Sequence, residues 1–280
     1  MLSSLPIVDL AEWRSDEEEP LGARDKEWMA APGGPWEGTW LFKSPRTTGL
    51  PELGADLWAE FIAFGIAQEA GVPAAEVRLA IRHGHRGVIS RRIEGDLAHG
   101  NELLAARKPN YPVAEKGPVL GYDLDAIEAV LRPYGGSESG LSAFESFAGY
   151  LTFDALIGNT DRHHENWAVI RNDQCLAPTY DHGASLGFNV PPRLRTPADS
   201  VSSRARSRHF PEFHSLVDLA LGVLHRVPLE IRDKWLSRVA GVAEDRLHHL
   251  VAGVPSGWMS DSARNFVVEL VLANQRRLTL

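Results

Sequence analysis

The chain has 280 residues, of which 44% are apolar and 24% are charged, and it contains eight tryptophans. This composition is typical of a folded chain that can form one large domain or two lobes, and it excludes an intrinsically disordered protein. The net charge of -8 argues against a general nucleic-acid binder, because phosphate backbones are held by clustered cations.

Residues 1–95 alternate between strand-like and helix-like patterns. Residues 39–44 form a strand-like run that stops at a proline, and residues 56–70 carry apolar side chains at helical spacing before a Gly-Val-Pro stop. Residues 77–81 and 88–93 read as two further strands joined by a glycine-containing turn. These patterns predict a small lobe of mixed strands and helix.

Residues 96–280 are dominated by helical patterns. Residues 99–117 contain Asn, Pro and Lys and are expected to be irregular, whereas 123–131 and 141–157 have the spacing of helices. Residues 191–210 are rich in Pro, Ser and Arg, which predicts a long exposed loop. The remaining sequence predicts three or four amphipathic helices. The chain is therefore expected to be an α+β protein of two lobes, 1–95 and 96–280, with a cleft between them.

The most informative stretch follows the helix predicted for 141–157. Asp161 and Asn166 form a D-x-x-x-x-N pattern, and a short strand and a turn then lead to Asp181 and Gly183 in a D-x-G pattern. Phosphoryl transfer needs a carboxylate that orients the attacking hydroxyl and accepts its proton, and it needs hard oxygen ligands for magnesium. A loop and a hairpin that face each other would supply both. Gly183 is expected to let the backbone turn directly after the metal ligand.

Each of these residues alone has an ordinary structural explanation. Asp161 and Asn166 are residue types that cap helices or turns, and Asp181 is a common turn residue. All three in this order, after a helix and around a hairpin, favour the catalytic interpretation.

These segments resemble the catalytic and metal-binding loops of HipA-like Ser/Thr protein kinases, and the D-R-H-x-x-N and D-x-G patterns are also similar to those of phosphatidylinositol 3/4-kinases. The resemblance implies a two-lobed, protein-kinase-like fold and transfer of the γ-phosphate of ATP, with Mg²⁺ as cofactor, to a protein hydroxyl. It implies that Asp161 is the catalytic base and that Asn166 and Asp181 hold the metal. His163 matches a family histidine that faces the γ-phosphate, and a hydrogen bond within the loop is the open alternative.

The first lobe contains a candidate nucleotide lysine. The chain has five lysines against 24 arginines, and Lys43 stands in the strand before the helix predicted for 56–70. Its point charge would pair with the α- and β-phosphates, and the alternative is a lysine that extends to water. Glu60 is the only acid in an apolar stretch of that helix, and by resemblance to the kinase Lys–Glu pair it is the partner of Lys43. The alternative for Glu60 is a solvent-facing position.

Two further nucleotide contacts are implied by the resemblance. The segment that contains Gly22 and Lys26 resembles the family's phosphate-covering loop, although it offers one glycine where other kinases have several. Backbone groups of Arg92, Ile93 and Glu94, after the strand predicted for 88–93, are expected to form the hinge that binds adenine.

Other functions remain open from the residues alone. One is a kinase of a small molecule or a lipid head group, because the phosphoryl-transfer residues do not define the acceptor. Another is a nucleotide-binding pseudokinase. A metal hydrolase built from His163, His164, Asp161 and His182 is disfavoured, because paired metal-binding histidines on a helix normally stand four residues apart.

The sequence also gives expectations about the compartment and the binding partners of the protein. Cys175 is the only cysteine, which fits a reducing compartment, and the N-terminal residues lack a secretory pattern. No run approaches the roughly 20 apolar residues of a membrane span, so a cytoplasmic protein without membrane or direct nucleic-acid contacts is expected. The family resemblance adds a possible antitoxin-like partner beside the protein substrate.

Overall fold

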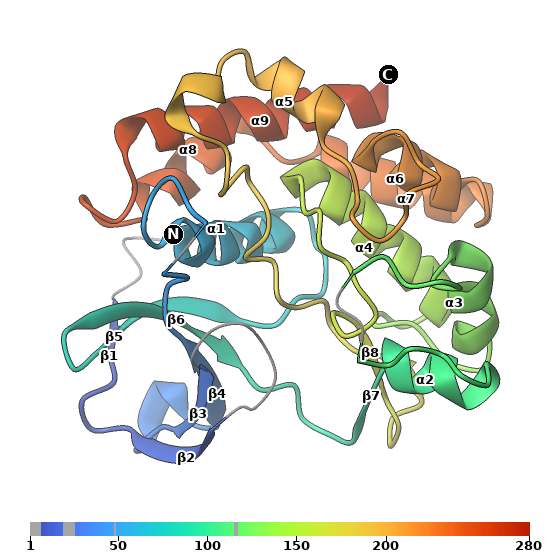
Figure 1. Ribbon diagram of the computed structural model, residues 1–280, viewed down its shortest axis with the longest axis horizontal. Helices are drawn as coiled ribbons and strands as arrows, with labels where there is room; N and C mark the ends of the chain where they lie inside the picture. Colours follow the sequence, from blue (N-terminus) through green and yellow to red (C-terminus); the bar gives the residue numbers. More distant parts are fainter. Residues whose placement is uncertain (1–6, 19–25, 48, 115–116) are drawn as a thin grey trace.

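A six-stranded sheet forms the N-terminal part of the computed structural model, which describes residues 7–18, 26–47, 49–114 and 117–280 (Figure 1). The strand order is β1-β5-β6-β4-β3-β2. β1 and β5 run parallel, and the other neighbours pair antiparallel. The strands are β1 (Val8–Asp9), β2 (Arg14–Glu18), β3 (Lys26–Ala30), β4 (Thr39–Lys43), β5 (Val77–Arg82) and β6 (His85–Arg91).

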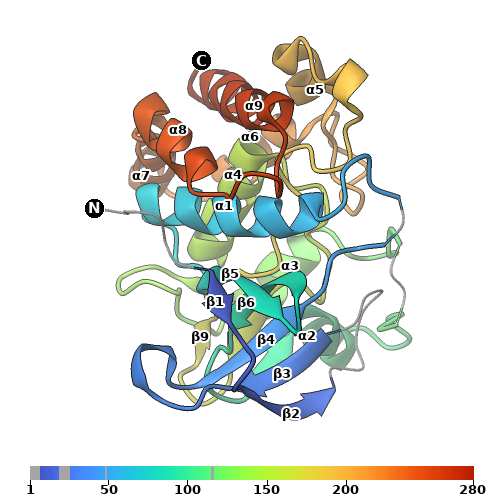
Figure 2. The same ribbon diagram turned by 90° about the vertical axis from the view of Figure 1, so that its left-hand side faces the viewer.

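Helix α1 (Ala55–Glu69) lies between this sheet and the C-terminal helices (Figure 2). Residues 55–67 are all buried. A helix that is apolar on every face must be covered on both sides, and α1 packs on β5 and β6 on one side and on α8 (Glu244–Ala252) and α4 (Ala143–Ile157) on the other. Gly71, with a φ of 62°, adopts the left-handed conformation at the predicted end of the helix.

The C-terminal part combines helices with a three-stranded sheet of order β7-β8-β9. Helix α4 lies within it and packs against α6, α7 and α9. Its capping box, formed by Ser142 and Glu145, explains why the helix begins where it does. The elements are β7 (Leu97–His99), α2 (Gly100–Arg107), α3 (Leu124–Leu131), β8 (Ala168–Ile170), β9 (Cys175–Leu176), α5 (Ala198–Arg204), α6 (Leu216–Leu224), α7 (Leu229–Ala240) and α9 (Asp261–Thr279), with short 3₁₀ turns at Gly34–Trp36 and Pro192–Leu194.

One hydrophobic core runs through both parts of the chain. Trp58 of α1, Phe147 of α4, Trp167 and Trp235 are fully buried members of the same cluster. A second, smaller cluster around Trp40 covers the other face of the six-stranded sheet. The expected boundary near residue 95 falls between β6 and β7, and because the core continues across it, the division into two domains remains a prediction.

The α+β, kinase-like fold class is confirmed, and of the three or four helices expected after residue 213, four are present as α6 to α9. Two local expectations are wrong. Residues 99–117 are not irregular throughout, because α2 occupies 100–107. Residues 191–210 are not simply an exposed loop: they contain α5, which packs on α9, and the buried side chains of Arg195, His209 and Phe210.

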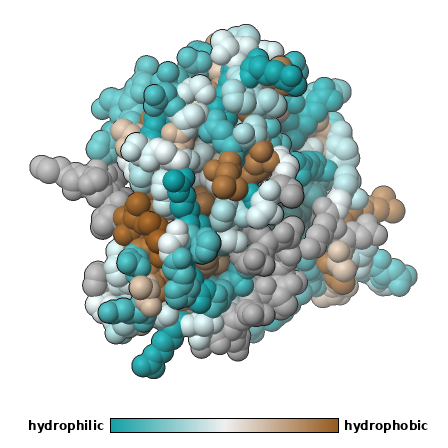
Figure 3. Space-filling model, turned by 60° about the vertical axis from the view of Figure 1, so that its left-hand side comes forward, coloured by the Kyte–Doolittle hydropathy of each residue, from teal (hydrophilic) through white to brown (hydrophobic). Residues whose placement is uncertain are grey.

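On the face drawn in Figure 3, hydrophilic side chains predominate among the coloured residues, and the apolar ones gather in a few separate groups. Among the helices that the structure describes, none combines the length and the apolar character that a membrane crossing requires.

Candidate active site

Lys43 stands at the meeting point of the two parts of the chain. It is the last residue of β4, and its side chain is 3% exposed. Its Nζ lies 2.5 Å from Oε1 of Glu60 on α1 and 3.1 Å from Oδ1 of Asp181. A buried lysine is stabilised as a cation only when carboxylates surround it. The expected Lys43–Glu60 pair therefore forms, and it extends to the D-x-G segment.

Arg162 holds the loop of the first motif against α4. Its Nε and Nη2 donate to the two carboxylate oxygens of Asp154, both at 2.7 Å. Its Nη1 donates to the carbonyl of Asn166 at 2.5 Å and to that of Tyr180 at 3.4 Å. The buried guanidinium of Arg162 thus holds the backbone of Asn166 close to that of Tyr180, the residue before Asp181.

The backbone of Asp161 is fixed on both sides. Its N–H donates to Oδ1 of Asn159 at 3.2 Å, and its carbonyl accepts a 2.7 Å hydrogen bond from Nδ2 of Asn166. Helix α4 ends at Ile157, and the loop begins at its C-cap residue Gly158, whose φ of 67° is a conformation that favours glycine. Tyr122 adds a bond from its hydroxyl to the carbonyl of Arg162 at 2.9 Å.

The carboxylate of Asp161 has a partner that the sequence did not suggest. Nε2 of His209 lies 3.0 Å from its Oδ1. Burial by itself raises the pKa of Asp161, but the hydrogen bond from His209, the nearby imidazoles and Arg208 outweigh it, so the pKa lies below its ordinary value. Asp161 is therefore an ionised carboxylate, the form in which it can accept a proton.

His163 lies close to both aspartates. Burial lowers the pKa of its imidazole, and the carboxylates of Asp161 and Asp181 oppose this shift without cancelling it. Its Nδ1 also accepts the backbone N–H of Glu165 at 3.2 Å. The alternative of a hydrogen bond within the loop is therefore present, and it leaves Nε2 as the ring nitrogen available to a phosphate.

Asp181 adopts the strained backbone conformation of the D-x-G segment. Its φ is 59°, in the left-handed region that non-glycine residues rarely occupy. Gly183 has no positive φ, but it lies in a turn with Ala184, so the turn expected after Asp181 is present. Tyr180, the residue before Asp181, is held by a hydrogen bond from its hydroxyl to the carbonyl of Glu165 at 2.9 Å.

Residues 92–94 connect the two sheets, as a hinge would. The N–H of Arg92 donates to the carbonyl of Thr39 at 3.0 Å, and its guanidinium lies over Trp28. Ile93 packs against the apolar cluster of β8 and β9, and Glu94 is exposed. Among the described residues, none accepts a hydrogen bond from the N–H of Ile93 or Glu94, and the adenine-binding role of this segment stays a prediction.

The structure places Lys26 opposite Lys43, in register between β3 and β4, so both side chains lie on one face of the sheet. Gly22, the other residue expected in the phosphate loop, lies outside the described residues. The role of this loop remains a prediction.

The residues present fit a magnesium ion. Asp181 offers a carboxylate and Asn166 an amide oxygen that accepts no hydrogen bond from the part of the chain that the structure describes, and hard oxygen ligands of this kind suit Mg²⁺. No group of three or more His, Cys, Asp or Glu side chains is arranged for a metal within the described ranges.

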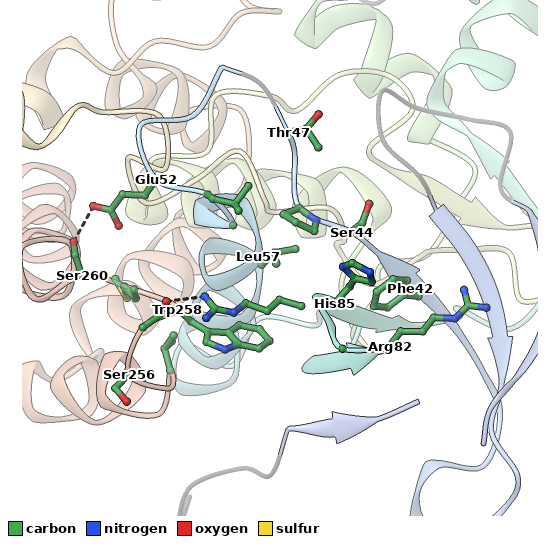
Figure 4. A pocket seen from close by; sticks show the side chains of 18 of the residues that line it. Phe42, Ser44, Thr47, Glu52, Leu57, Arg82, His85, Ser256, Trp258 and Ser260 are labelled. Atoms are coloured by element: carbon green, nitrogen blue, oxygen red, sulfur yellow. Dashed lines mark hydrogen bonds between the residues drawn. The ribbon is translucent and has the colours of Figure 1, made fainter. Parts of the chain in front are cut away.

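A large groove lies apart from these loops. It has a volume of about 1930 Å³ and is lined by the end of β4, the β5–β6 hairpin, the start of α1 and the α8–α9 connection (Figure 4). Arg86 crosses one end, donating to the carbonyl of Gly257 at 2.6 Å and lying over the ring of Trp258. Because Asp161, Asn166 and Asp181 do not line it, this groove is not the candidate active site.

Sequence reasoning found the charged residues of the site but missed the side chains that hold them. Arg162 stands inside the recognised motif, but the sequence does not show that its side chain is buried. His209 and Tyr122 are far away in sequence, and their own neighbourhoods contain no motif.

A paired Lys43 and Glu60 on one side and the Asp161 and Asp181 loops on the other are the arrangement of a protein-kinase-like fold. The chain belongs to the family of the HipA-like C-terminal domain, whose model matches residues 20–247.

Solved structures agree on the fold. The proinflammatory kinase CtkA of Helicobacter pylori matches with a TM-score of 0.70 at 15% identity, over 98% of each chain. HipA of Shewanella oneidensis, solved with HipB and operator DNA as a toxin–antitoxin system, matches with a TM-score of 0.59 at 14% identity, over 95% of this chain and 66% of that chain.

One curated relative matches part of the sequence. It is "Putative kinase Y4dM" of Sinorhizobium fredii, which is 29% identical over 164 residues. The match spans 51% of this chain and 37% of that relative.

Proposed function

We propose that the protein is an ATP- and Mg²⁺-dependent kinase that transfers the γ-phosphate to a Ser or Thr hydroxyl of another protein. The observation that carries this proposal is the contact of Lys43 with both Glu60 and Asp181, at 2.5 and 3.1 Å. This contact joins Lys43, the candidate nucleotide-binding lysine of the N-terminal part, to Asp181 of the D-x-G segment in the C-terminal part. Membership of the HipA-like family and the CtkA-like fold support the same function.

The roles of the residues follow from their chemistry. Lys43 would pair with the α- and β-phosphates, and the hinge around Ile93 would receive the adenine. Asn166 and Asp181 would hold Mg²⁺, which when bound neutralises charge on the phosphates. His163 would contact the γ-phosphate through Nε2.

Asp161 would act on the acceptor. In the transfer, a bond forms between the acceptor oxygen and the γ-phosphorus, and the bond from that phosphorus to the bridging oxygen breaks, releasing ADP. The proton of the hydroxyl passes to the carboxylate of Asp161, which the low pKa keeps ionised beforehand.

The partner and the compartment are part of the proposal. HipA of Shewanella oneidensis was solved with HipB and operator DNA, and we propose an antitoxin-like protein partner for this chain in the cytoplasm. The net charge of -8 supports recognition of DNA through such a partner rather than by this chain.

The test is transfer of label from [γ-³²P]ATP in a cytosolic extract. With MgCl₂ present, we expect label in protein as phosphoserine or phosphothreonine above the level of the extract alone, and a rate of labelling roughly 10²–10⁴ lower with the Asp161→Asn variant. Label only in the lipid or small-molecule fraction would overturn the protein acceptor. Binding of ATP without any transfer by the wild-type chain would indicate a pseudokinase.

A further inference from the structure

His209 lies against the carboxylate of Asp161 but belongs to neither motif. We propose that His209 is a positioning residue for phosphoryl transfer: its Nε2–H fixes Oδ1 of Asp161, so that the second carboxylate oxygen is presented to the acceptor hydroxyl. This inference rests on the proposed function, because it gives His209 a task only if Asp161 is the base.

The position of His209 is fixed by its surroundings. Its ring packs edge-on against Tyr122, with centroids 6.4 Å apart, and lies 5.4 Å from the ring of His163. The next residue, Phe210, is fully buried and packs on Tyr122 at 5.0 Å. The histidine side chain is 2% exposed and therefore holds one orientation.

The backbone around His209 is attached to the catalytic loop itself. The N–H of Arg208 donates to the carbonyl of Thr160, the residue before Asp161, at 3.0 Å. The N–H of His209 donates to Oγ of Ser207 at 3.1 Å. The segment thus follows the loop that carries the base, and any displacement of one moves the other.

The proton on His209 can be assigned from its contacts. An ionised carboxylate only accepts hydrogen bonds, so Nε2 must carry the hydrogen that lies between it and Asp161. Nδ1 is buried and has no hydrogen-bond partner among the described residues, so a hydrogen there would lack an acceptor. The Nε2–H tautomer is therefore the one that the site favours.

The contact restrains the one part of Asp161 that the loop leaves free. Its backbone N–H and carbonyl are both bonded within the loop, but its side chain can still rotate. No described group besides His209 donates to the carboxylate. With Oδ1 engaged, Oδ2 is the oxygen available to the acceptor. A base that is misplaced by about 1 Å can cost roughly 100-fold in rate.

The experiment compares three variants in single-turnover phosphoryl transfer. His209→Phe keeps the ring against Tyr122 and removes the N–H, whereas His209→Gln supplies a side-chain amide N–H of similar reach. His214→Phe, at an exposed histidine on the same segment, is the matched control. We expect the Phe variant to lose about 10- to 100-fold in rate with the KM for ATP unchanged, and the Gln variant to recover most of the loss.

The double variant separates positioning from a structural effect. In an Asp161→Asn background, His209→Phe should cost less than about twofold, because effects of residues that act as one unit are not additive. Three results would each overturn the proposal. The first is a further tenfold loss of rate from His209→Phe in the Asp161→Asn background. The others are a His209→Phe variant that is as fast as the His214→Phe control, and a His209→Gln variant that is as slow as His209→Phe. Wild-type activity of Asp161→Asn alone would instead overturn the proposed function. If His209→Phe lowers the melting temperature, the transfer rates of His209→Gln and wild type, compared with and without Asp161→Asn, still test the proposal.

Discussion

Arg162 and Asp154 form a two-fold hydrogen-bonded ion pair in the interior, with both donor–acceptor distances at 2.7 Å and both side chains 2% exposed. The pair joins the catalytic loop to α4. The same guanidinium donates to the carbonyl of Asn166 and, at a longer distance, to that of Tyr180. The geometry of the candidate site therefore depends on a salt bridge that does no chemistry.

The first prediction concerns this pair. Asp154→Ala should lower the free energy of unfolding by about 3–5 kcal/mol, because it leaves the guanidinium of Arg162 buried without its counter-ion. Urea unfolding at pH 7 measures this. The control is Asp125→Ala, at an 88% exposed carboxylate that pairs with Arg226, which should cost less than about 1 kcal/mol. Equal costs for the two variants would show that the buried pair does not hold the fold.

The second prediction concerns Lys43. Lys43→Met removes the cation that Glu60 and Asp181 surround, and it should lower kcat/KM by about 10²–10³, the usual loss for one group that stabilises developing charge. Lys108→Met, at an exposed lysine, is the control. Steady-state kinetics with ATP and MgCl₂ measure both, and a Lys43 variant that matches the control would contradict the nucleotide role.

The third prediction concerns Gly100, at the start of α2. Its N–H donates to the carbonyl of Trp167 at 3.0 Å, and a Cβ would collide with the ring of Trp167 and lie 2.6 Å from the carbonyl oxygen of His164. Gly100→Ala should therefore cost about 1–3 kcal/mol of stability and displace the catalytic loop. Gly117→Ala, where a Cβ meets no atom within 4 Å, is the control. Thermal unfolding that does not distinguish the two would refute the prediction.

The fourth prediction concerns pH. Glu52 accepts hydrogen bonds from Arg195 at 2.7 Å and Ser260 at 2.8 Å. Burial raises its pKa, but these bonds and the charge of Arg195 outweigh it, and the pKa in the folded state is lowered. The carboxylate therefore contributes stability that is fully present above its unfolded pKa of about 4.5 and is lost as the pH falls through the lower, folded value.

The measurement compares wild type with Glu52→Gln by urea unfolding between pH 7 and pH 3. At pH 7 the variant should be about 1.5–3 kcal/mol less stable, the usual value for a hydrogen bond to a charged group. The difference should shrink as the pH falls below about 4.5. Glu244→Gln, at a 65% exposed carboxylate, is the control and should cost less than about 1 kcal/mol at pH 7. A difference that stays constant to pH 3 would contradict the assignment.

Much of the fold follows from local patterns. The apolar spacing of α1 and α4 is strong because both helices are buried on nearly every face, and their ends carry a glycine or a capping box. Helices α2 and α5 were missed for the opposite reason. Both are short, and each buries only two residues, Gly100 and Leu104 in α2 and Ala198 and Ser202 in α5, so their stability comes from contacts far away in sequence. Ser202 of α5, for example, donates to Asn274 of α9 at 2.6 Å.

For the candidate site, too, one part could be predicted from the sequence and another part could not. The order of Asp161, Asn166 and Asp181 after a helix and around a hairpin predicts that the two motifs face each other. The contact between Asp161 and His209 spans 48 positions in sequence and joins a motif to a segment rich in arginine and serine. Only the fold brings these two side chains together, and the positive φ of Asp181 could likewise not be predicted from the sequence.

The most direct test of the central claim separates binding from transfer at one site. Melting temperatures with ATP, with and without MgCl₂, are measured for wild type, Asp161→Asn and Asp181→Asn, together with phosphoryl transfer by each. We predict that Asp161→Asn keeps the Mg-dependent stabilisation by ATP and loses roughly 10²–10⁴ in transfer rate, whereas Asp181→Asn loses both. Wild-type transfer by Asp161→Asn, or full Mg-dependent stabilisation of Asp181→Asn, would contradict the account.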